Sequence, residues 1–134
     1  MIAGLLARTL GAIRCECPLA WCELVRQGDG LHLALAFGDE RFTVRGDGLD
    51  LRVGPPEDAS IRVEASVEAL TRVIMGEHSL VDSVVRDEVF IAGDPAALVR
   101  LDRLTWLFVA GAARSESTAP LLDELLKQSA RPMN

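Results

Sequence analysis

Apolar and polar side chains alternate through residues 31–65, and this period of two limits what the chain can fold into. Alternation over four to eight residues is typical of strands that bury one face. Turns rich in Gly and Asp at 38–39 and 47–48 separate the first three runs, which predicts an antiparallel meander. A fourth run follows at residues 60–65, after Gly-Pro-Pro at 54–56.

Helical spacing replaces the alternation on both sides of this region. Apolar residues recur every three or four positions in residues 2–13, 66–76 and 95–110, and again in the leucine-rich residues 121–128. A fifth strand is expected from about Val84 to Ala92. Strands and helices in separate runs predict an α+β fold.

Residues 89–101, VFIAGDPAALVRL, join the last predicted strand to the longest predicted helix. Gly93 turns the chain, Asp94 is a suitable N-cap, and Pro95 occupies the first helical position, where its missing N–H is not needed. The later part of this helix, LTWLFV at 104–109, carries no charge. We expect such a helix to be covered all round, by core, ligand or partner.

The composition favours one domain with an aliphatic interior. The chain has 134 residues, a hydrophobic content of 49% and only 4% aromatics, with no Tyr. A cavity in such an interior suits an alkyl or isoprenoid chain better than a base or a sugar. We expect a single domain over residues 1–114, and a linker followed by a C-terminal amphipathic helix over residues 115–134.

Charge and hydropathy exclude several classes of partner. The net charge is −6 and the basic residues are scattered singly, so the clustered basic face that nucleic-acid binding requires is not visible. No apolar run reaches the roughly 18–20 residues that span a bilayer. Arg8 and Arg14 interrupt the apolar start, and no cleavage pattern follows. We therefore expect a cytoplasmic protein.

The sequence predicts neither a metal site nor a cofactor. Cys15, Cys17 and Cys22 are odd in number, which argues against a closed set of disulfides, and their spacing fits no structural zinc pattern. His32 and His78 are distant in the chain. We expect reduced thiols that pack as small hydrophobic groups.

No catalytic motif stands out either. The chain contains no G-x-S-x-G, H-E-x-x-H or C-x-x-C sequence, and hairpin turns account for its Gly-x-Gly pairs. The Arg-Gly-Asp tripeptide at 45–47 is explained in the same way, because turns favour Gly and Asp. We predict that the protein is not an enzyme.

Two segments resemble the sterol carrier protein 2 family, in particular its stand-alone bacterial members. They are residues 60–76, SIRVEASVEALTRVIMG, and residues 89–101. The matching positions are Leu70, Gly76, Val89, Ile91, Gly93, Asp94, Leu98 and Leu101. The resemblance covers about residues 31–110. It implies a five-stranded antiparallel sheet, helices packed on one of its faces, and an apolar tunnel between sheet and helices.

The resemblance also implies a site and a function. The family binds fatty acyl, sterol and isoprenoid lipids without chemistry. The corresponding tunnel wall in this chain would consist of Phe42, Val44, Val73, Ile74, Val89, Ile91, Leu101, Leu104, Thr105 and Phe108. Thr105 and His32 are the polar contacts that we can name. Where the family usually has Gly-Lys, this chain has Arg86, Asp87 and Glu88, which we expect to narrow the tunnel mouth.

Two functions follow as hypotheses. The first is non-enzymatic carriage of a hydrophobic small molecule or lipid, with transient membrane contact. The alternative is a protein-interaction or dimerisation module with a collapsed tunnel, for example an accessory factor in lipid or quinone biosynthesis. In that case Leu121, Leu122, Leu125 and Leu126 would fill the groove of a second copy.

Overall fold

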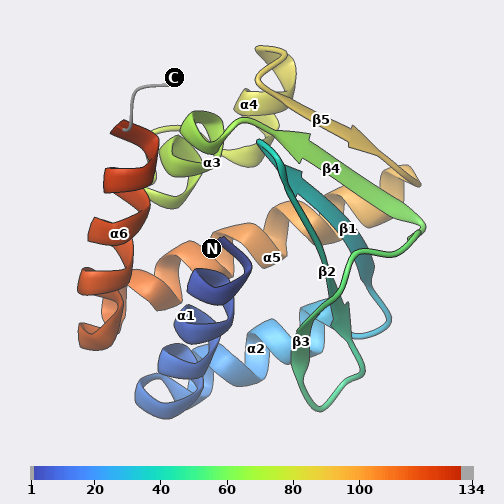
Figure 1. Ribbon diagram of the computed structural model, residues 1–134. Helices are drawn as coiled ribbons and strands as arrows, with labels where there is room; N and C mark the ends of the chain where they lie inside the picture. The colour runs from blue at the N-terminus through green and yellow to red at the C-terminus, as the bar shows by residue number, and fades with distance from the viewer. Residues whose placement is uncertain (1, 131–134) are drawn as a thin grey trace.

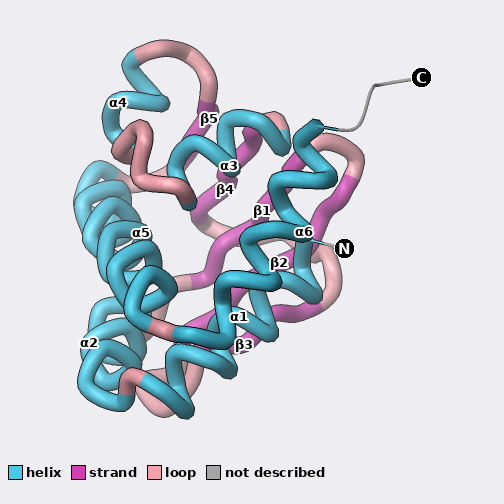
Figure 2. The backbone as a smooth tube through the Cα atoms, turned by 90° about the vertical axis from the view of Figure 1, so that its left-hand side faces the viewer, coloured by secondary structure: helices cyan, strands magenta, loops and turns pink. Residues whose placement is uncertain are grey.

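The computed structural model describes residues 2–130, which form one sheet with helices gathered on one of its faces (Figures 1 and 2). Figure 2 shows the helices in front of the strands. The strands are β1 His32–Phe37, β2 Glu40–Gly46, β3 Leu51–Gly54, β4 Ile61–Ala65 and β5 Val89–Ala92. The helices are α1 Ile2–Glu16, α2 Pro18–Gly28, α3 Val67–Ile74, α4 Leu80–Val85, α5 Pro95–Arg114 and α6 Ala119–Ala130.

The sheet has the order β3-β2-β1-β4-β5 and is mixed. Three neighbouring pairs are antiparallel, but β1 and β4 run parallel, with Leu33 opposite Ile61 and Leu35 opposite Val63. The prediction of a purely antiparallel sheet was therefore wrong at this pair. β3 ends at the edge of the sheet, and residues 55–60 carry the chain back across it to the free side of β1. Parallel neighbours require such a crossover.

The alternation of the sequence decides which side chains meet the helices. Leu33 lies opposite Val44 and Leu35 opposite Phe42, and all four are buried on the helical face. His32 and Arg45, one residue out of phase, point to the opposite face. A slip of one residue would exchange the two faces, so the hydrophobic pattern holds the register.

The predicted strand-to-helix hinge is confirmed. The Asp94 carboxylate accepts a hydrogen bond from the Ala96 N–H at 3.0 Å, and Pro95 opens α5. Ser66 caps α3 in the same way, accepting from the Ala69 N–H at 3.1 Å. Both helix starts were thus encoded locally, by a cap side chain next to an apolar period.

The last strand is shorter than predicted. It begins at Val89 rather than near Val84, because residues 80–85 form helix α4, which Ser79 caps. Val85, which lies within the predicted strand, is 77% exposed on α4. Asp87 then takes a left-handed conformation, with φ of 59°, to turn the chain into β5.

Helix α5 is not covered all round, contrary to expectation. Leu101 and Leu104 are buried, but Trp106 is 70% exposed. An uncharged stretch of helix therefore did not require complete burial, because α5 lies at the surface of the helical layer (Figure 2).

Residues 115–120, expected as a linker, contain a 3-10 helix at Glu116–Thr118 that leads directly into α6. Thr118 is fully buried, and its hydroxyl donates to the carbonyl oxygens of Ala112 and Ser115. Leu125 joins the same core from α6. A domain boundary at residue 114 stays a prediction, because only the folding of the shortened chain tests it. Among residues 2–130, no helix combines the length and apolarity needed to cross a membrane.

A close backbone approach joins the end of β2 to the end of α2. The Gly46 N–H donates to the Leu31 carbonyl, and a Cβ at Gly46 would lie 2.0 Å from the Gly28 carbonyl oxygen. We expect Gly46→Ala to lower the free energy of unfolding by about 2–3 kcal/mol. Urea denaturation at neutral pH measures this difference.

Gly11→Ala is the matched control. Gly11 lies inside α1 with no atom within 4 Å of the added Cβ, so alanine should raise the stability by about 0.5–1 kcal/mol. Equal stability of the two variants would contradict the close approach.

Candidate ligand cavity

A cavity of about 180 Å³ lies between the sheet and the helices. All five strands and all six helices contribute to its wall. The lining residues are Ile2, Leu5, Leu6, Thr9, Leu10, Leu24, Leu33, Leu35, Phe37, Val44, Leu51, Val63, Ala65, Leu70, Val73, Ile74, Leu80, Val89, Leu101, Leu104, Thr105, Phe108, Leu121, Leu122 and Leu125.

The wall presents hydrocarbon almost everywhere. Its polar side chains are Thr9 and Thr105, whose hydroxyls donate to the carbonyl oxygens of Leu5 and Leu101, each at 2.8 Å. Each hydroxyl proton is thus used within its own helix. The wall therefore offers a ligand no charged group and no free side-chain donor.

The volume limits what the cavity holds in this conformation. An apolar cavity of about 150 Å³ stays dry and accommodates a benzene-sized molecule, whereas pockets for drug-sized ligands start near about 300 Å³. A long hydrocarbon chain therefore needs the walls to move apart.

Most of the residues predicted for the tunnel wall come together here. Val44, Val73, Ile74, Val89, Leu101, Leu104, Thr105 and Phe108 all line the cavity. Phe42 and Ile91 do not, although both lie on the helical face of the sheet. Phe42 is buried with its ring 5.9 Å from that of Phe37. Ile91 lies opposite Val63 and packs against the core from the edge strand.

The two ends of the chain contribute wall residues that the family resemblance did not imply. Helix α1 supplies Leu5 and Leu6, among others, and α6 supplies Leu121, Leu122 and Leu125. Their helical leucine spacing was visible, but it could not say whether they would cover this chain or a neighbour. The two helices contact each other (Figure 1), and both contribute residues to the cavity wall.

Carboxylates anchor α1 at both ends. Glu40, at the start of β2, accepts the N–H groups of Ile2 at 2.7 Å and Ala3 at 2.8 Å. Glu16 accepts the Ser115 hydroxyl at 2.5 Å and the Ser117 N–H at 3.4 Å. The first pair of bonds holds α1 to the sheet, and the second holds it to the segment before α6.

These hydrogen bonds also change the acidity of the two carboxyls. The Ser115 hydroxyl, and then Ser117, lower the pKa of Glu16. Burial of Glu40 raises its pKa, but the hydrogen bonds that it accepts, including those from Ala3 and Ile2, lower it more. The pKa of Glu40 therefore lies below its usual value.

Comparison with known proteins tests the fold. Neither a family model nor a curated protein matches the sequence. Among solved structures, the UbiJ-SCP2 ubiquinone synthesis protein superposes with a TM-score of 0.58 at 17% identity, over 80% of this chain and 87% of that one. Sterol carrier protein 2 from Yarrowia lipolytica, in its apo form, has a TM-score of 0.55 at 11% identity, over 79% of this chain and 88% of that one. Sterol carrier protein 2 like 2 from Aedes aegypti has a TM-score of 0.52 at 14% identity, over 76% of this chain and 94% of that one.

The chain has the sterol carrier protein 2 fold. The resemblance stated from residues 60–76 and 89–101 is thereby confirmed at the level of the fold. The mixed sheet and the helical layer described above are this chain's version of it.

The charged residues expected at the mouth of a sterol carrier protein 2 tunnel lie elsewhere. None of Arg86, Asp87 and Glu88 lines the cavity. Glu88 Oε2 lies 3.3 Å from Arg72 Nη1 and 3.5 Å from His78 Nδ1, so this carboxylate joins α3 to the start of β5. The expectation that these charges narrow a tunnel mouth stays a prediction, because they do not belong to the wall of the cavity.

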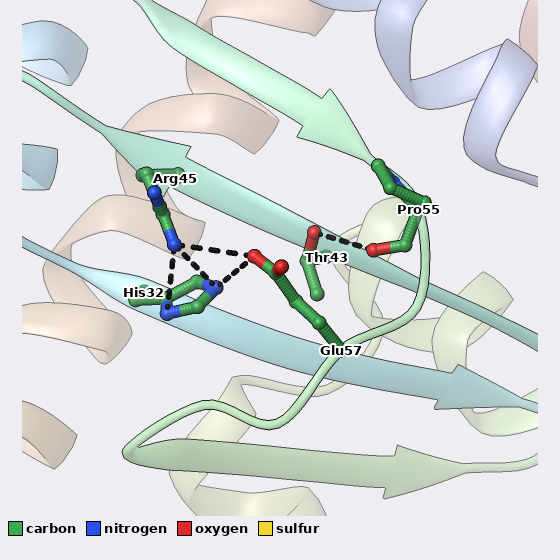
Figure 3. Close-up of polar contacts among 5 residues, drawn as sticks. All are labelled: His32, Thr43, Arg45, Pro55 and Glu57. Atoms are coloured by element: carbon green, nitrogen blue, oxygen red, sulfur yellow. Dashed lines mark hydrogen bonds and ion pairs between the residues drawn. The ribbon is translucent and has the colours of Figure 1, made fainter.

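His32 is not a cavity residue either. It lies on the other face of the sheet, where its Nε2 is 3.0 Å from Glu57 Oε1 and 3.4 Å from Arg45 Nη2 (Figure 3). The Thr43 hydroxyl donates to the Pro55 carbonyl at 3.0 Å nearby. These contacts tie the crossover segment 55–60 to β1 and β2.

The described residues contain no group of three or more His, Cys, Asp or Glu side chains placed to hold a metal ion. Cys15, Cys17 and Cys22 are free thiols on α1, between the helices, and on α2.

Glu40→Gln tests the anchor of α1. A neutral amide is a weaker acceptor at a helix N-terminus, so we expect the free energy of unfolding to fall by about 1 kcal/mol at pH 7. Because the folded-state pKa of Glu40 is lowered, its contribution is present above the unfolded-state pKa and lost as the pH falls through the folded-state pKa. The difference between the two proteins should therefore shrink in acid. Urea denaturation at a series of pH values measures it.

Asp39→Asn serves as the control, because this neighbouring carboxyl is exposed in the turn before β2. It should change the stability by less than about 0.5 kcal/mol. A stability difference for Glu40→Gln that did not vary with pH would contradict the role of the charge.

Proposed function

We propose that the protein binds a hydrophobic ligand in this cavity and carries it without chemical change. The ligand class is a fatty acyl, sterol-like or isoprenoid lipid. The observation that carries the proposal is the wall itself, which is hydrocarbon apart from two threonines whose hydroxyl protons are already used. The sterol carrier protein 2 fold supports it.

Binding by such a wall has a predictable character. Burial stabilises the complex by about 25 cal/mol for each Å² of apolar surface removed from water. Buried polar groups are what discriminate strongly between similar ligands, and the wall lacks them. We therefore expect selection by length and thickness of the chain rather than by head group.

A lipid chain requires more room than about 180 Å³. We propose that α1 and α6 move outward to provide it, because they close one side of the cavity from opposite ends of the chain. Their mutual ion pair, Arg8 to Glu124 at 3.4 Å, is exposed at both partners and should be weak. Phe42 and Ile91 would then border the enlarged tunnel together with the residues that line the cavity.

The small volume favours a second candidate function. A tunnel that stays collapsed would leave an interaction module, as in an accessory factor of lipid or quinone biosynthesis. The structural similarity to a ubiquinone synthesis protein makes a polyprenyl quinone a necessary probe alongside fatty acids. For either function we propose a cytoplasmic location, as expected from the sequence.

Native mass spectrometry of freshly purified protein, followed by solvent extraction, separates the two. A reproducible extra mass that extracts into organic solvent supports the carrier and identifies its lipid class. A clean mass, with no uptake of added fatty acid or polyprenyl quinone, contradicts carriage and favours the interaction module.

Thr105→Phe should block uptake by filling the cavity. We expect the affinity for a fluorescent fatty acid to fall by about tenfold or more, while the fold persists, because the lost threonine hydroxyl bonds only within α5. Thr105→Val keeps the volume and removes the hydroxyl, so its affinity should be unchanged. Titration of each variant with the same fatty acid provides the comparison. Equal affinities of the Thr105→Phe and Thr105→Val variants for the fatty acid would exclude the cavity as the binding site.

A further inference from the structure

The two edge strands of the sheet differ in how well they are protected against pairing with a strand of another chain. Edge strands expose unpaired backbone groups, and monomeric proteins usually block them with charge, proline or a covering segment. β3 carries Arg52 and is followed by Pro55 and Pro56. β5, at the opposite edge, reads Val-Phe-Ile-Ala over residues 89–92 and has neither charge nor proline. Within the strand itself, β5 is therefore the edge with less protection, although it is only four residues long and α4 lies beside its start.

The outer side of β5 has no partner within the described residues. The backbone hydrogen bonds of β5 run to β4, and no other backbone segment, nor any side chain that the structure describes, bonds to it. Because an edge strand pairs on one side only, half of its N–H and C=O groups face outward. β5 lies at the outer border of the sheet in Figure 1.

Exposed apolar side chains accompany this edge. Phe90 is 53% exposed on β5, and the preceding helix α4 exposes Val81, Val84 and Val85. Helix α4 lies beside the start of β5 (Figure 1). An apolar surface that borders an unpaired strand is a typical site of association.

We propose that a second copy of this chain covers the edge, with β5 pairing antiparallel to β5 of the partner about a twofold axis. In the register that places Phe90 opposite its counterpart, Val89 lies opposite Ile91 of the second copy. The two five-stranded sheets then form one continuous sheet, and the same patch serves both copies, as twofold symmetry requires.

One pair of opposite charges favours this arrangement. Arg86 precedes the strand and Asp94 follows it, and both are exposed. Antiparallel pairing brings the Arg86 end of one copy to the Asp94 end of the other, twice in the dimer. The Arg86 end also carries Asp87 and Glu88, of which Glu88 is already paired with Arg72, and in the register given above it is Arg86 that stands opposite Asp94 of the second copy. Arg86 makes no ion pair with another described residue, which leaves it available.

Phe90→Lys tests the edge in the full-length chain. The new ammonium lies on the exposed side of β5 opposite Glu64, so the fold should persist, which thermal unfolding checks. We expect sedimentation equilibrium to show a dimer for the unmodified protein and a dissociation constant at least about 100-fold weaker for the variant. Leu49→Lys, at an exposed position in the turn before β3, should leave the dimer unchanged.

Arg86→Glu tests the end charges separately. It should weaken the dimer by about five- to tenfold, and added salt should then strengthen the dimer instead of weakening it, because like charges would face each other.

Phe90→Cys tests the register, in a chain whose three natural cysteines are replaced by serine. Residues directly opposite in an antiparallel pair have Cβ atoms about 4.5–5.5 Å apart, so mild oxidation should produce a covalent dimer, and Leu49→Cys should not. A chain that stays monomeric throughout the concentration series overturns the proposal. So does a dimer that survives Phe90→Lys, because its interface must then lie elsewhere.

Discussion

Burial of one face of the sheet is the constraint on which the rest of the structure depends. All five strands turn aliphatic side chains to the same side, and a sheet with such a face is stable only when another layer covers it. The cover comes from both ends of the chain, since α1, α2, α5 and α6 all reach this side (Figure 2). An interior built from branched aliphatic residues, with few aromatic rings to fill the gaps, leaves the cavity at the centre of this contact.

The opposite face of the sheet has a different role. The crossover between β3 and β4 runs over it, and Glu57 joins this segment to His32 and Arg45 (Figure 3). The same crossover lets β4 enter the sheet parallel to β1. His32, which the sequence suggested as a polar ligand contact, thus helps to hold the crossover segment on the face of the sheet opposite the cavity.

The wall residues were implied by the sterol carrier protein 2 resemblance, and side-chain alternation or helical spacing agrees with the face on which they lie. Val44, Val89 and Leu101 were expected in the wall and line it. Alternation assigns a residue to a face of the sheet but not to a position relative to the cavity. Phe42 therefore lies on the expected face but outside the cavity wall. The predicted start of the last strand near Val84 was wrong, because a cap at Ser79 begins helix α4 before it.

The sequence by itself determined the alternating strands of residues 31–65, the caps at Ser66 and Asp94, and the aliphatic chemistry of the interior. These depend on residues close together in the chain, so spacing and cap chemistry suffice to predict them. Only the tertiary structure decided that β4 pairs with β1, that α1 and α6 close the same cavity, and that the β5 edge is left open. Each of these contacts joins segments that are distant in the sequence. The burial of apolar surface selects the partners, and many different sequences could provide such a surface, so local spacing does not identify them.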